Sequence, residues 1–415
     1  MKILAPYGYF APEQAASSYL WKNLHEDLAK EDIVCFVYTP IPCRGVSEEV
    51  RNQYKVKKSE VLYDGKLIIE RFRLWKEPKS TFWRFVRYFL QCGCQYFNLA
   101  FRKDQSCDLI FAASTPPIIG ATCAMIKKRL QIPFVYNLQD IFPDSLMGTN
   151  ITHTQGLLWK VGRKLEDFTY RNADKIIVIS EDFKKNLIAK GVSEDKIVVV
   201  YNWVDQNAVV NIDRKDNIMF KRYNLDPTKF YIEYSGNIGL TQNMDMLLDV
   251  MNELQVSHPE INLVLVGDGA YKKQVEKIVA DKQLKNVIML PFQDYADISH
   301  VFSLGDAGLV ISKPGVGANS VPSKTWSIMS ANRPVLANFD ENELKSILTD
   351  NECGIFTKAG DKDAFKQSII TLFENRELCK HYGCNGRKYI IDNLTREVGT
   401  QKYISVLNSV VNFKK

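Results

Sequence analysis

Short apolar runs alternate with longer stretches of helical periodicity along the whole chain. Apolar runs of about four to eight residues between polar or glycine-containing segments favour buried strands, and longer amphipathic stretches favour helices. A chain that repeats strand and helix in this order is typical of an α/β fold with parallel sheets. The pattern therefore predicts this fold class before any single residue is considered.

The first half of the chain carries several such runs, and its helix boundaries are marked by suitable residues. Ser180 stands before Glu181 as an N-cap residue would, and Gly191 stands where the following helix would end. The expected strands are Lys2–Ala5, Ile33–Tyr38, Leu67–Arg73, Asp108–Ala113, Phe134–Leu138, Lys175–Ile179 and Lys196–Tyr201, and the expected helices include Ser17–Ala29, Gly156–Tyr170 and Glu181–Ala189.

The same alternation restarts after residue 205. Two α/β halves in succession predict two domains with a cleft between them. We place the N-terminal domain at residues 1–205 and the C-terminal domain at residues 206–392, and we expect residues 393–415 to form a helix that crosses back to the N-terminal domain. The expected strands of the second half are Phe230–Tyr234, Asn262–Val266, Asn286–Leu290, Ala307–Ile311, Pro334–Ala337 and Gly354–Phe356, and its helices include Asn243–Leu254, Tyr271–Asp281, Ser323–Ala331, Asp363–Glu374 and Arg396–Phe413.

Composition and charge narrow the possible partners and the compartment. The 415 residues are 46% apolar with a formal charge of +6, too small an excess to indicate a nucleic-acid-binding protein. Nine cysteines without a Cys-x-x-Cys pair favour a reducing compartment. The first residues lack the pattern of a secretion signal, and no uncharged apolar stretch of about 18 residues predicts a spanning helix. We therefore expect a cytoplasmic protein.

Three loops between an expected strand and an expected helix carry residue types suited to a phosphate group. Ligands of open parallel sheets bind where strands end and loops lead into helices. Glycines there let the backbone and its free N–H groups approach an anion closely. Each loop taken singly also fits an ordinary strand–helix turn. The loops are Tyr234–Gln242, Val266–Gly269 and Asn319–Lys324.

Lys324 stands in an unfavourable place unless an anion lies nearby. Pro322 fits the start of a helix, so Ser323 and Lys324 are expected in its first turn. A helix N-terminus already carries partial positive charge, which disfavours a lysine. A bound phosphate group would resolve this conflict. The alternative is a solvated surface lysine.

Five segments of the chain occur in a characteristic order: Asp140–Asp144, Tyr201–Asp205, Ser235–Gly239, Val266–Gly269 and Pro322–Lys324. Together they resemble the large retaining GT-B glycosyltransferase family over nearly the whole chain. They look closest to the bacterial branch that builds O-antigens, capsules and colanic-acid-type polysaccharides, which includes N-acetyl-fucosamine transferases.

The resemblance implies a GT-B fold, in which two Rossmann-like domains with parallel sheets face a central cleft. It implies transfer of a hexosyl or N-acetylaminosugar group from a nucleotide-diphosphate donor, expected to be a UDP-sugar, with retention of configuration. The implied acceptor is a polyprenyl-diphosphate-linked sugar or a polysaccharide. No cofactor is expected, since a GT-B site can act without a metal.

The resemblance also implies roles for individual residues. Asp140 and Lys324 would be catalytic: Asp140 would orient the acceptor or stabilise positive charge on the sugar, and Lys324 would offset charge on the leaving diphosphate. The other expected contacts to substrate lie in an N-terminal loop, around the diphosphate and around the nucleoside. They are Ala15, Ser17, Gly236, Asn237, Gly239, Gln242, Gly267, Asp268, Phe292, Ser320, Pro322 and Ser323.

Three departures from the family pattern leave some contacts open. Many relatives carry two glutamates where this chain has Asn319 and Ser327. Relatives outside this branch often place Arg and Lys after the first glycine loop, where Asn237 and Gln242 stand here. The N-terminal loop also lacks paired glycines. These departures leave open which side chain contacts the sugar hydroxyls.

The positive charge of the chain is concentrated in one aromatic segment, residues 71–103. Rings and cations on one helix suit the interface of an anionic membrane, and the alternative is a core helix with a basic outer edge. The membrane interpretation predicts a protein held peripherally at the inner face of the cell membrane. The basic residues of the segment are Arg71, Arg73, Lys76, Lys79, Arg84, Arg87, Arg102 and Lys103.

Two other functions fit parts of this pattern. A nucleotide-sugar epimerase of the same fold would need no acceptor, so release of nucleotide only with acceptor present would exclude it. A non-catalytic GT-B binding protein would fit the missing glutamates, and unchanged nucleotide binding after loss of Lys324 would favour it.

Overall fold

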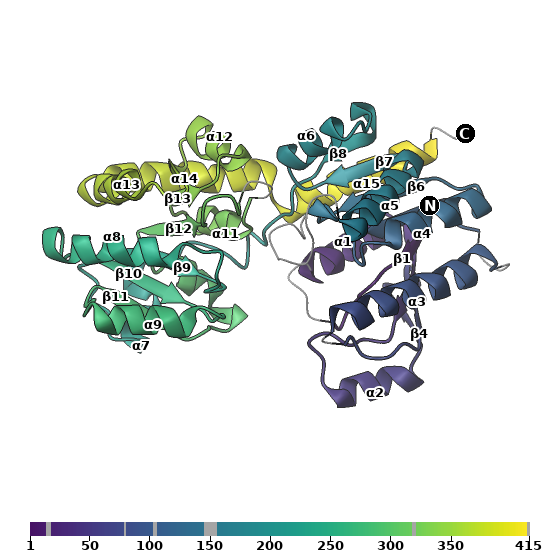
Figure 1. The fold of residues 1–415 in the computed structure, drawn as a ribbon, viewed down its shortest axis with the longest axis horizontal. Coiled ribbons are helices and arrows are strands. Elements are labelled where there is room, and N and C mark those ends of the chain that lie inside the picture. Colours follow the sequence, from purple (N-terminus) through teal and green to yellow (C-terminus); the bar gives the residue numbers. More distant parts are fainter. Residues whose placement is uncertain (14–17, 79, 103–105, 145–155, 318–320, 413–415) are drawn as a thin grey trace. The chain divides into compact units, whose positions relative to one another are not determined.

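The computed structural model describes residues 1–13, 18–78, 80–102, 106–144, 156–317 and 321–412 (Figure 1). The chain forms two compact units. Unit 1 comprises Met1–Tyr201 with Gly399–Lys415, and unit 2 comprises Asn202–Val398. The division falls slightly before the boundary expected after residue 205. The chain rejoins unit 1 at Gly399, inside the last helix, rather than at residue 393.

Unit 1 is built on an eight-stranded sheet with the strand order β3-β4-β2-β1-β5-β6-β7-β8. All neighbours are parallel except β3 and β4, which pair antiparallel. The register places Ile3 opposite Cys35 and Leu109. The strands are β1 (Lys2–Pro6), β2 (Val34–Pro40), β3 (Ser59–Leu62), β4 (Leu67–Phe72), β5 (Leu109–Ala113), β6 (Phe134–Leu138), β7 (Lys175–Val178) and β8 (Ile197–Val199).

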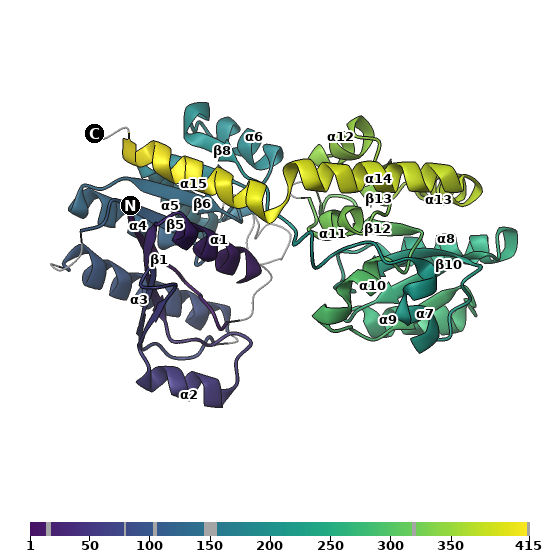
Figure 2. The same cartoon turned by 180° about the vertical axis from the view of Figure 1, so that it is seen from behind.

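Helices cover both faces of the first sheet. Apolar residues of α3, α4 and α5 pack with alternate residues of β5 and β6 in one buried cluster. On the other face, Phe111 packs edge-on against Trp21 of α1 and Tyr403 of α15, and Figure 2 shows α15 in yellow along this unit. The helices are α1 (Ser18–Lys30), α2 (Glu48–Val56), α3 (Thr81–Ala100), α4 (Ile119–Leu130), α5 (Leu157–Asn172), α6 (Glu181–Ala189) and α15 (Arg396–Asn412).

Unit 2 is built on a six-stranded parallel sheet with the order β11-β10-β9-β12-β13-β14. Because the central strands are buried on both faces, their sequences are nearly continuous apolar runs. The strands are β9 (Phe230–Ser235), β10 (Ile261–Val266), β11 (Val287–Leu290), β12 (Ala307–Ile311), β13 (Val335–Phe339) and β14 (Gly354–Lys358).

Two helical layers enclose the second sheet. Residues of α8, α9 and α13 pack with Phe230, Ile232 and Tyr234 of β9 on one face. Residues of α7 and α10 pack with Tyr231 on the other face. No helix in the described part of the chain is long and apolar enough to cross a membrane. The helices are α7 (Ile218–Arg222), α8 (Met244–Ser257), α9 (Lys272–Asp281), α10 (Ile298–Phe302), α11 (Lys324–Ser330), α12 (Glu343–Asp350), α13 (Lys362–Glu374) and α14 (Arg376–Asn393).

The strand orders define where each sheet can bind a ligand. In unit 2 the chain passes from β9 outward to β11 and then returns to β12 on the other side of β9. In unit 1 the corresponding change of direction lies between β1 and β5. Crevices at the carboxyl ends of such strands are the usual ligand sites of doubly wound sheets. A ligand site is therefore expected at the loops after β9 and β12 in unit 2, and at those after β1 and β5 in unit 1.

Candidate functional site

The loop after β9 is held in shape by its own hydrogen bonds. The N–H of Gly236 donates to the carbonyl of Val266 at 3.0 Å, and that of Ile238 donates to the carbonyl of Asp268 at 2.8 Å. The N–H of Gly239 donates to Oε1 of Gln242 at 3.0 Å. The expectation that the glycines of this loop present free N–H groups to an anion is therefore wrong for Gly236 and Gly239, whose N–H groups are engaged within the protein.

The glycines of this loop and of the next serve close backbone packing. A Cβ on Gly267 would collide with the carbonyl oxygen of Gly236, and one on Gly269 would collide with that of Ile238. Gly236 and Gly267 also have φ angles of 133° and 149°, which favour glycine. The two loops thus form one rigid unit at the carboxyl ends of β9 and β10.

Lys324 brings a positive charge to this pair of loops. Its Nζ lies 3.6 Å from the centroid of the Tyr234 ring, and a Cβ on Gly236 would lie 3.2 Å from the same atom. Among the described residues it makes no hydrogen bond or ion pair. Burial lowers the pKa of Lys324 to about 8, against the opposite influence of Glu233. An amine buried beside a glycine loop without a partner is suited to receive an anion.

The structure gives a different reason from the expected one for why a positive charge on Lys324 is unfavourable. The helix begins at Lys324 and has only seven residues, with Ser323 before it. A helix this short contributes little dipole of its own. The charge of Lys324 is destabilised by burial rather than by the end of a helix.

Glu233 is a residue of this site that the sequence patterns did not indicate. It lies in the middle of β9 with 1% of its surface exposed, and one carboxylate oxygen accepts a hydrogen bond from the Ser235 hydroxyl. Its other oxygen, Oε2, has no hydrogen-bond partner among the described residues. Burial raises the pKa of Glu233 to about 7, while Ser235 and Lys324 act in the opposite direction.

The other residues of unit 2 that were expected to contact the substrate differ in how exposed their side chains are. Phe292, in the loop after β11, is 77% exposed, so its ring is available for stacking. Asp268 and Ser323 are exposed, Asn237 lies at the surface of the glycine loop, and Pro322 is half-buried. Ser320, as well as Asn319, lies outside the described residues, as do Ala15 and Ser17 of unit 1.

The loop after β12 is fastened to the glycine loop. The N–H of Lys313 donates to the carbonyl of Thr241 at 2.8 Å. The carboxylate of Asp340 accepts the N–H groups of Gly315 and Gly317 at 2.9 and 2.7 Å. These contacts fix residues 313–317 beside the glycine loop.

In unit 1, Asp140 follows β6 and is exposed. Its neighbour Gln139 lines a cavity of about 340 Å³ at the change of strand direction. Asp144 pairs with Lys190 at 2.7 Å and is mostly buried, which gives it a structural role. The cavity is also lined by Tyr7, Tyr9, Phe10, Glu13, Trp21, Arg44 and Thr115.

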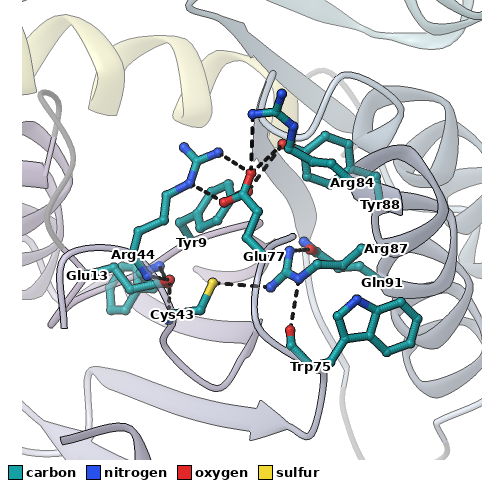
Figure 3. Close-up of polar contacts among 11 residues, drawn as sticks. Tyr9, Glu13, Cys43, Arg44, Trp75, Glu77, Arg84, Arg87, Tyr88 and Gln91 are labelled. Carbon is teal, nitrogen blue, oxygen red and sulfur yellow. Dashed lines mark hydrogen bonds and ion pairs between the residues drawn. The ribbon is translucent and has the colours of Figure 1, made fainter. Parts of the chain in front are cut away.

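Figure 3 shows the polar cluster beside this cavity. The guanidinium of Arg44 donates to both oxygens of Glu77, at 2.6 and 2.8 Å, and stacks 3.9 Å above the ring of Tyr9. Burial raises the pKa of Glu77, but hydrogen bonds from Arg44, Tyr88 and Tyr9 outweigh it and leave this pKa lowered. Glu77 therefore stays ionised and fixes Arg44 at the cavity wall.

The described residues contain no group of three or more His, Cys, Asp or Glu side chains that could hold a metal ion. The metal-independent reaction implied by the resemblance stays a prediction.

Residues 19–208 match the family model described as Glycosyltransferase Family 4. Residues 215–389 match the model described as Glycosyl transferases group 1. The first match lies in unit 1 except for its last residues, 202–208, and the second lies within unit 2.

Two relatives in sequence come from bacteria. The chain is 23% identical over 268 residues to WbjE of Pseudomonas aeruginosa, named a probable glycosyltransferase, which aligns over 64% of this chain and 66% of WbjE. It is 26% identical over 258 residues to WcaI of Escherichia coli K12, whose name assigns it provisionally to colanic acid biosynthesis. That match covers 61% of this chain and 63% of WcaI. The chain thus aligns with just under two thirds of the length of each.

A solved structure is similar over nearly the whole chain. HepE of Anabaena, in complex with UDP, matches with a TM-score of 0.73 at 15% identity. The match covers 99% of this chain and 100% of HepE. This likeness shows the two-domain α/β fold with parallel sheets.

Proposed function

We propose that this chain, a GT-B-type glycosyltransferase with a family 4 domain followed by a group 1 domain, transfers a sugar from a UDP-sugar to a carbohydrate acceptor. The observation that carries this proposal is the amine of Lys324 beside the interlocked glycine loops of unit 2. HepE has been solved with UDP and with UDP-glucose, which supports a uridine donor. The proposed setting is bacterial surface polysaccharide synthesis, of the O-antigen or capsule type, because WcaI is assigned to colanic acid biosynthesis.

The chemistry assigns a task to each of two residues. Breaking the bond from the anomeric carbon to the diphosphate leaves negative charge on the phosphate, which a fixed cation stabilises most in the transition state. Lys324 supplies that cation. Asp140 orients the acceptor or stabilises positive charge on the sugar. We propose retention of configuration, in which the departing diphosphate accepts the proton of the acceptor hydroxyl.

A turnover assay tests this function. We expect the full chain to release UDP from a UDP-sugar only when an acceptor glycan is present, and to form a product with the anomeric configuration of the donor, read by NMR. Asp140→Asn should keep the fold and lower turnover by about tenfold or more, equivalent to about 1.4 kcal/mol. Asp144→Asn is the matched control, because that carboxylate is held by Lys190. Release or epimerisation of the donor without acceptor would contradict a transferase.

We further propose that the acceptor is lipid-linked, as a polyprenyl-diphosphate sugar, and that unit 1 docks peripherally on the inner face of the cell membrane. The support is the outer face of α3. Large apolar side chains there are exposed at helical spacing, including Phe82 at 68%, Phe89 at 59% and Phe97 at 67%. Soluble surfaces rarely expose contiguous patches of this kind. The other exposed members around this face are Trp75, Trp83, Leu90 and Phe101.

The inner face of α3 is fixed against the unit, which leaves only the outer face free. Arg87 is fully buried and donates to the carbonyl of Trp75 at 3.0 Å and to Gln91 at 3.3 Å (Figure 3). Arg71 is also buried, with a bond to Glu60, and Arg102 pairs with Glu70. These three basic residues of the segment 71–103 are therefore engaged within unit 1.

This distribution makes a specific prediction for membrane binding. A combined Phe82→Ser, Phe89→Ser, Phe97→Ser variant should lose at least about nine-tenths of its flotation with phosphatidylglycerol-containing liposomes, because each buried ring contributes about 1.5–3 kcal/mol. Raising the salt concentration should weaken wild-type binding only partly, since salt screens charges but does not weaken the burial of apolar rings.

Val256→Ser is the control for this experiment, because Val256 on α8 is 83% exposed and lies outside the α3 face. It should float like the wild type. Equal flotation of the triple variant and the wild type would exclude this face as the docking surface, and absence of wild-type flotation would remove the membrane proposal.

A further inference from the structure

A glutamate stands where the fold calls for an apolar residue. β9 lies inside the second sheet, between β10 and β12, and Glu233 pairs with Val264 and Gly308 in the register. Residues of such a strand are buried on both sides, and an isolated carboxylate there costs several kcal/mol if it ionises. Its surroundings leave little room, since a Cβ on Gly305 would lie 2.7 Å from the Cβ of Glu233.

Only one of the two carboxylate oxygens of Glu233 accepts a hydrogen bond from a described residue. Ser235, two residues further along the same face of the strand, donates to Oε1. Oε2 is buried without a hydrogen-bond partner among the described residues. A fully buried carboxylate that is left half-satisfied in a central strand calls for a compensating interaction.

The one described cation that acts on Glu233 is Lys324. Lys324 enters from α11, beyond the end of β9, and its amine lies over the Tyr234 ring and beside Gly236. The two charges attract each other without forming an ion pair, because no described carboxylate lies within 4.0 Å of the amine. The negative charge of Glu233 can therefore favour the protonated form of Lys324 without occupying the N–H donors of the lysine amine.

We propose that Glu233 is a positioning residue for Lys324: from beneath the glycine loop it keeps the amine protonated and free to bind the donor diphosphate. This inference rests on the proposed function, because it takes the anion beside Gly236 to be a diphosphate. Glu233 itself does not touch the substrate. It acts only through the charge of Lys324.

The ionisation of the two groups supports this arrangement. Burial brings the pKa of Glu233 up to about 7 and that of Lys324 down to about 8, and each group moves the other back towards its ordinary value. The lysine must be protonated to bind the diphosphate, so affinity should fall as pH rises through about 8. Removing the negative charge of Glu233 lowers the pKa of Lys324, and the loss of affinity should then begin at lower pH.

Lys324 can be observed without any ligand. In protein labelled with ¹³C-lysine, the ε-carbon signal that disappears in Lys324→Met reports its protonation. We expect this signal to titrate near pH 8 in the wild type. In Glu233→Gln the midpoint should fall below that of the wild type, since loss of an opposite charge disfavours the charged form of the amine. Glu343→Gln, which alters another buried carboxylate of unit 2, should leave the midpoint in place.

Binding of UDP gives the second readout. Above pH 7 the terminal phosphate of UDP is already ionised, since its pKa is about 6, so the pH dependence of affinity reports the protein. At pH 8 we expect Glu233→Gln to bind UDP several-fold more weakly than wild type and the two to converge at lower pH. A variant with a merely structural defect would lower the melting temperature and leave the midpoint unchanged.

A second variant keeps the test decisive if Glu233→Gln fails to fold. Ser235→Ala removes the hydrogen bond that favours the ionised carboxylate, so the Lys324 midpoint should fall in the same direction by a smaller amount. An unchanged midpoint in a folded Glu233→Gln protein, or in Ser235→Ala when Glu233→Gln does not fold, would overturn the inference. If the midpoint moves but UDP does not bind, the role of Glu233 stands and the donor assignment fails.

Discussion

Replacing Lys324 with methionine should lower kcat/KM for the UDP-sugar by about 10²–10³-fold while the protein remains folded. Loss of one preorganised group that stabilises developing negative charge typically costs about 2.7–4 kcal/mol in the transition state. Methionine is an unbranched side chain only one atom shorter than lysine and removes a buried charge, so the free energy of unfolding should not decrease. The measurement is steady-state release of UDP with acceptor present, together with thermal unfolding.

The division of this loss between kcat and KM distinguishes the proposed role from simple binding. The charge on the diphosphate grows as the glycosidic bond breaks, so most of the effect should appear in kcat. Lys273→Met serves as the control, because Lys273 is an exposed lysine of α9 in the same unit. A Lys324→Met enzyme with normal kcat and weaker donor binding would reduce Lys324 to a binding residue, and one with normal values for both would exclude it.

The regular elements were largely predictable because their sequence patterns reflect burial on both sides of a sheet. The bounds expected for β6, β12 and α6 agree with those in the structure. Strand β3 was missed because its residues are mostly exposed and carry no apolar run. As an antiparallel edge strand, it is recognised only through its pairing with β4.

The residues of the candidate site could be predicted from the sequence, but the way in which they interact could not. The glycines of the two loops and Lys324 were identified from local sequence, and the structure brings them together. The hydrogen bonds that occupy the loop N–H groups could not be predicted from the sequence, because they depend on how the loops after β9 and β10 pack against each other. The glycines are needed for backbone contact between the loops.

Glu233 and Arg44 show why the remaining features were missed. Glu233 lies inside an apolar run that predicts a strand. The alternation of side chains along a strand shows which residues share a face, but it does not show that a lysine some 90 positions later lies near this one. Arg44 gains its role from Glu77 and Tyr9, which belong to separate loops. Such pairs depend on tertiary structure, and single-sequence patterns carry no signal for them.

Replacing Gly267 with alanine should destabilise unit 2 by about 2–6 kcal/mol and weaken UDP binding in the protein that remains folded. The new methyl group would collide with the carbonyl oxygen of Gly236, which cannot move away as a flexible side chain could. Overpacking of this kind typically costs about 1–3 kcal/mol, and an alanine at φ 149° adds backbone strain of about 1–3 kcal/mol. Urea unfolding and calorimetric titration with UDP measure the two effects.

Gly93→Ala is the matched control, because it adds the same methyl group where nothing described lies within 4 Å. Gly93 is inside α3, so alanine should raise the free energy of unfolding by about 0.5–1 kcal/mol. The opposite signs of the two substitutions would separate a glycine required by contact between the loops from one that merely occupies a helix. If Gly267→Ala were as stable as the wild type and bound UDP equally well, the rigid pairing of the two loops could not be what shapes the donor site, and the positioning of Lys324 against Gly236 would need another cause.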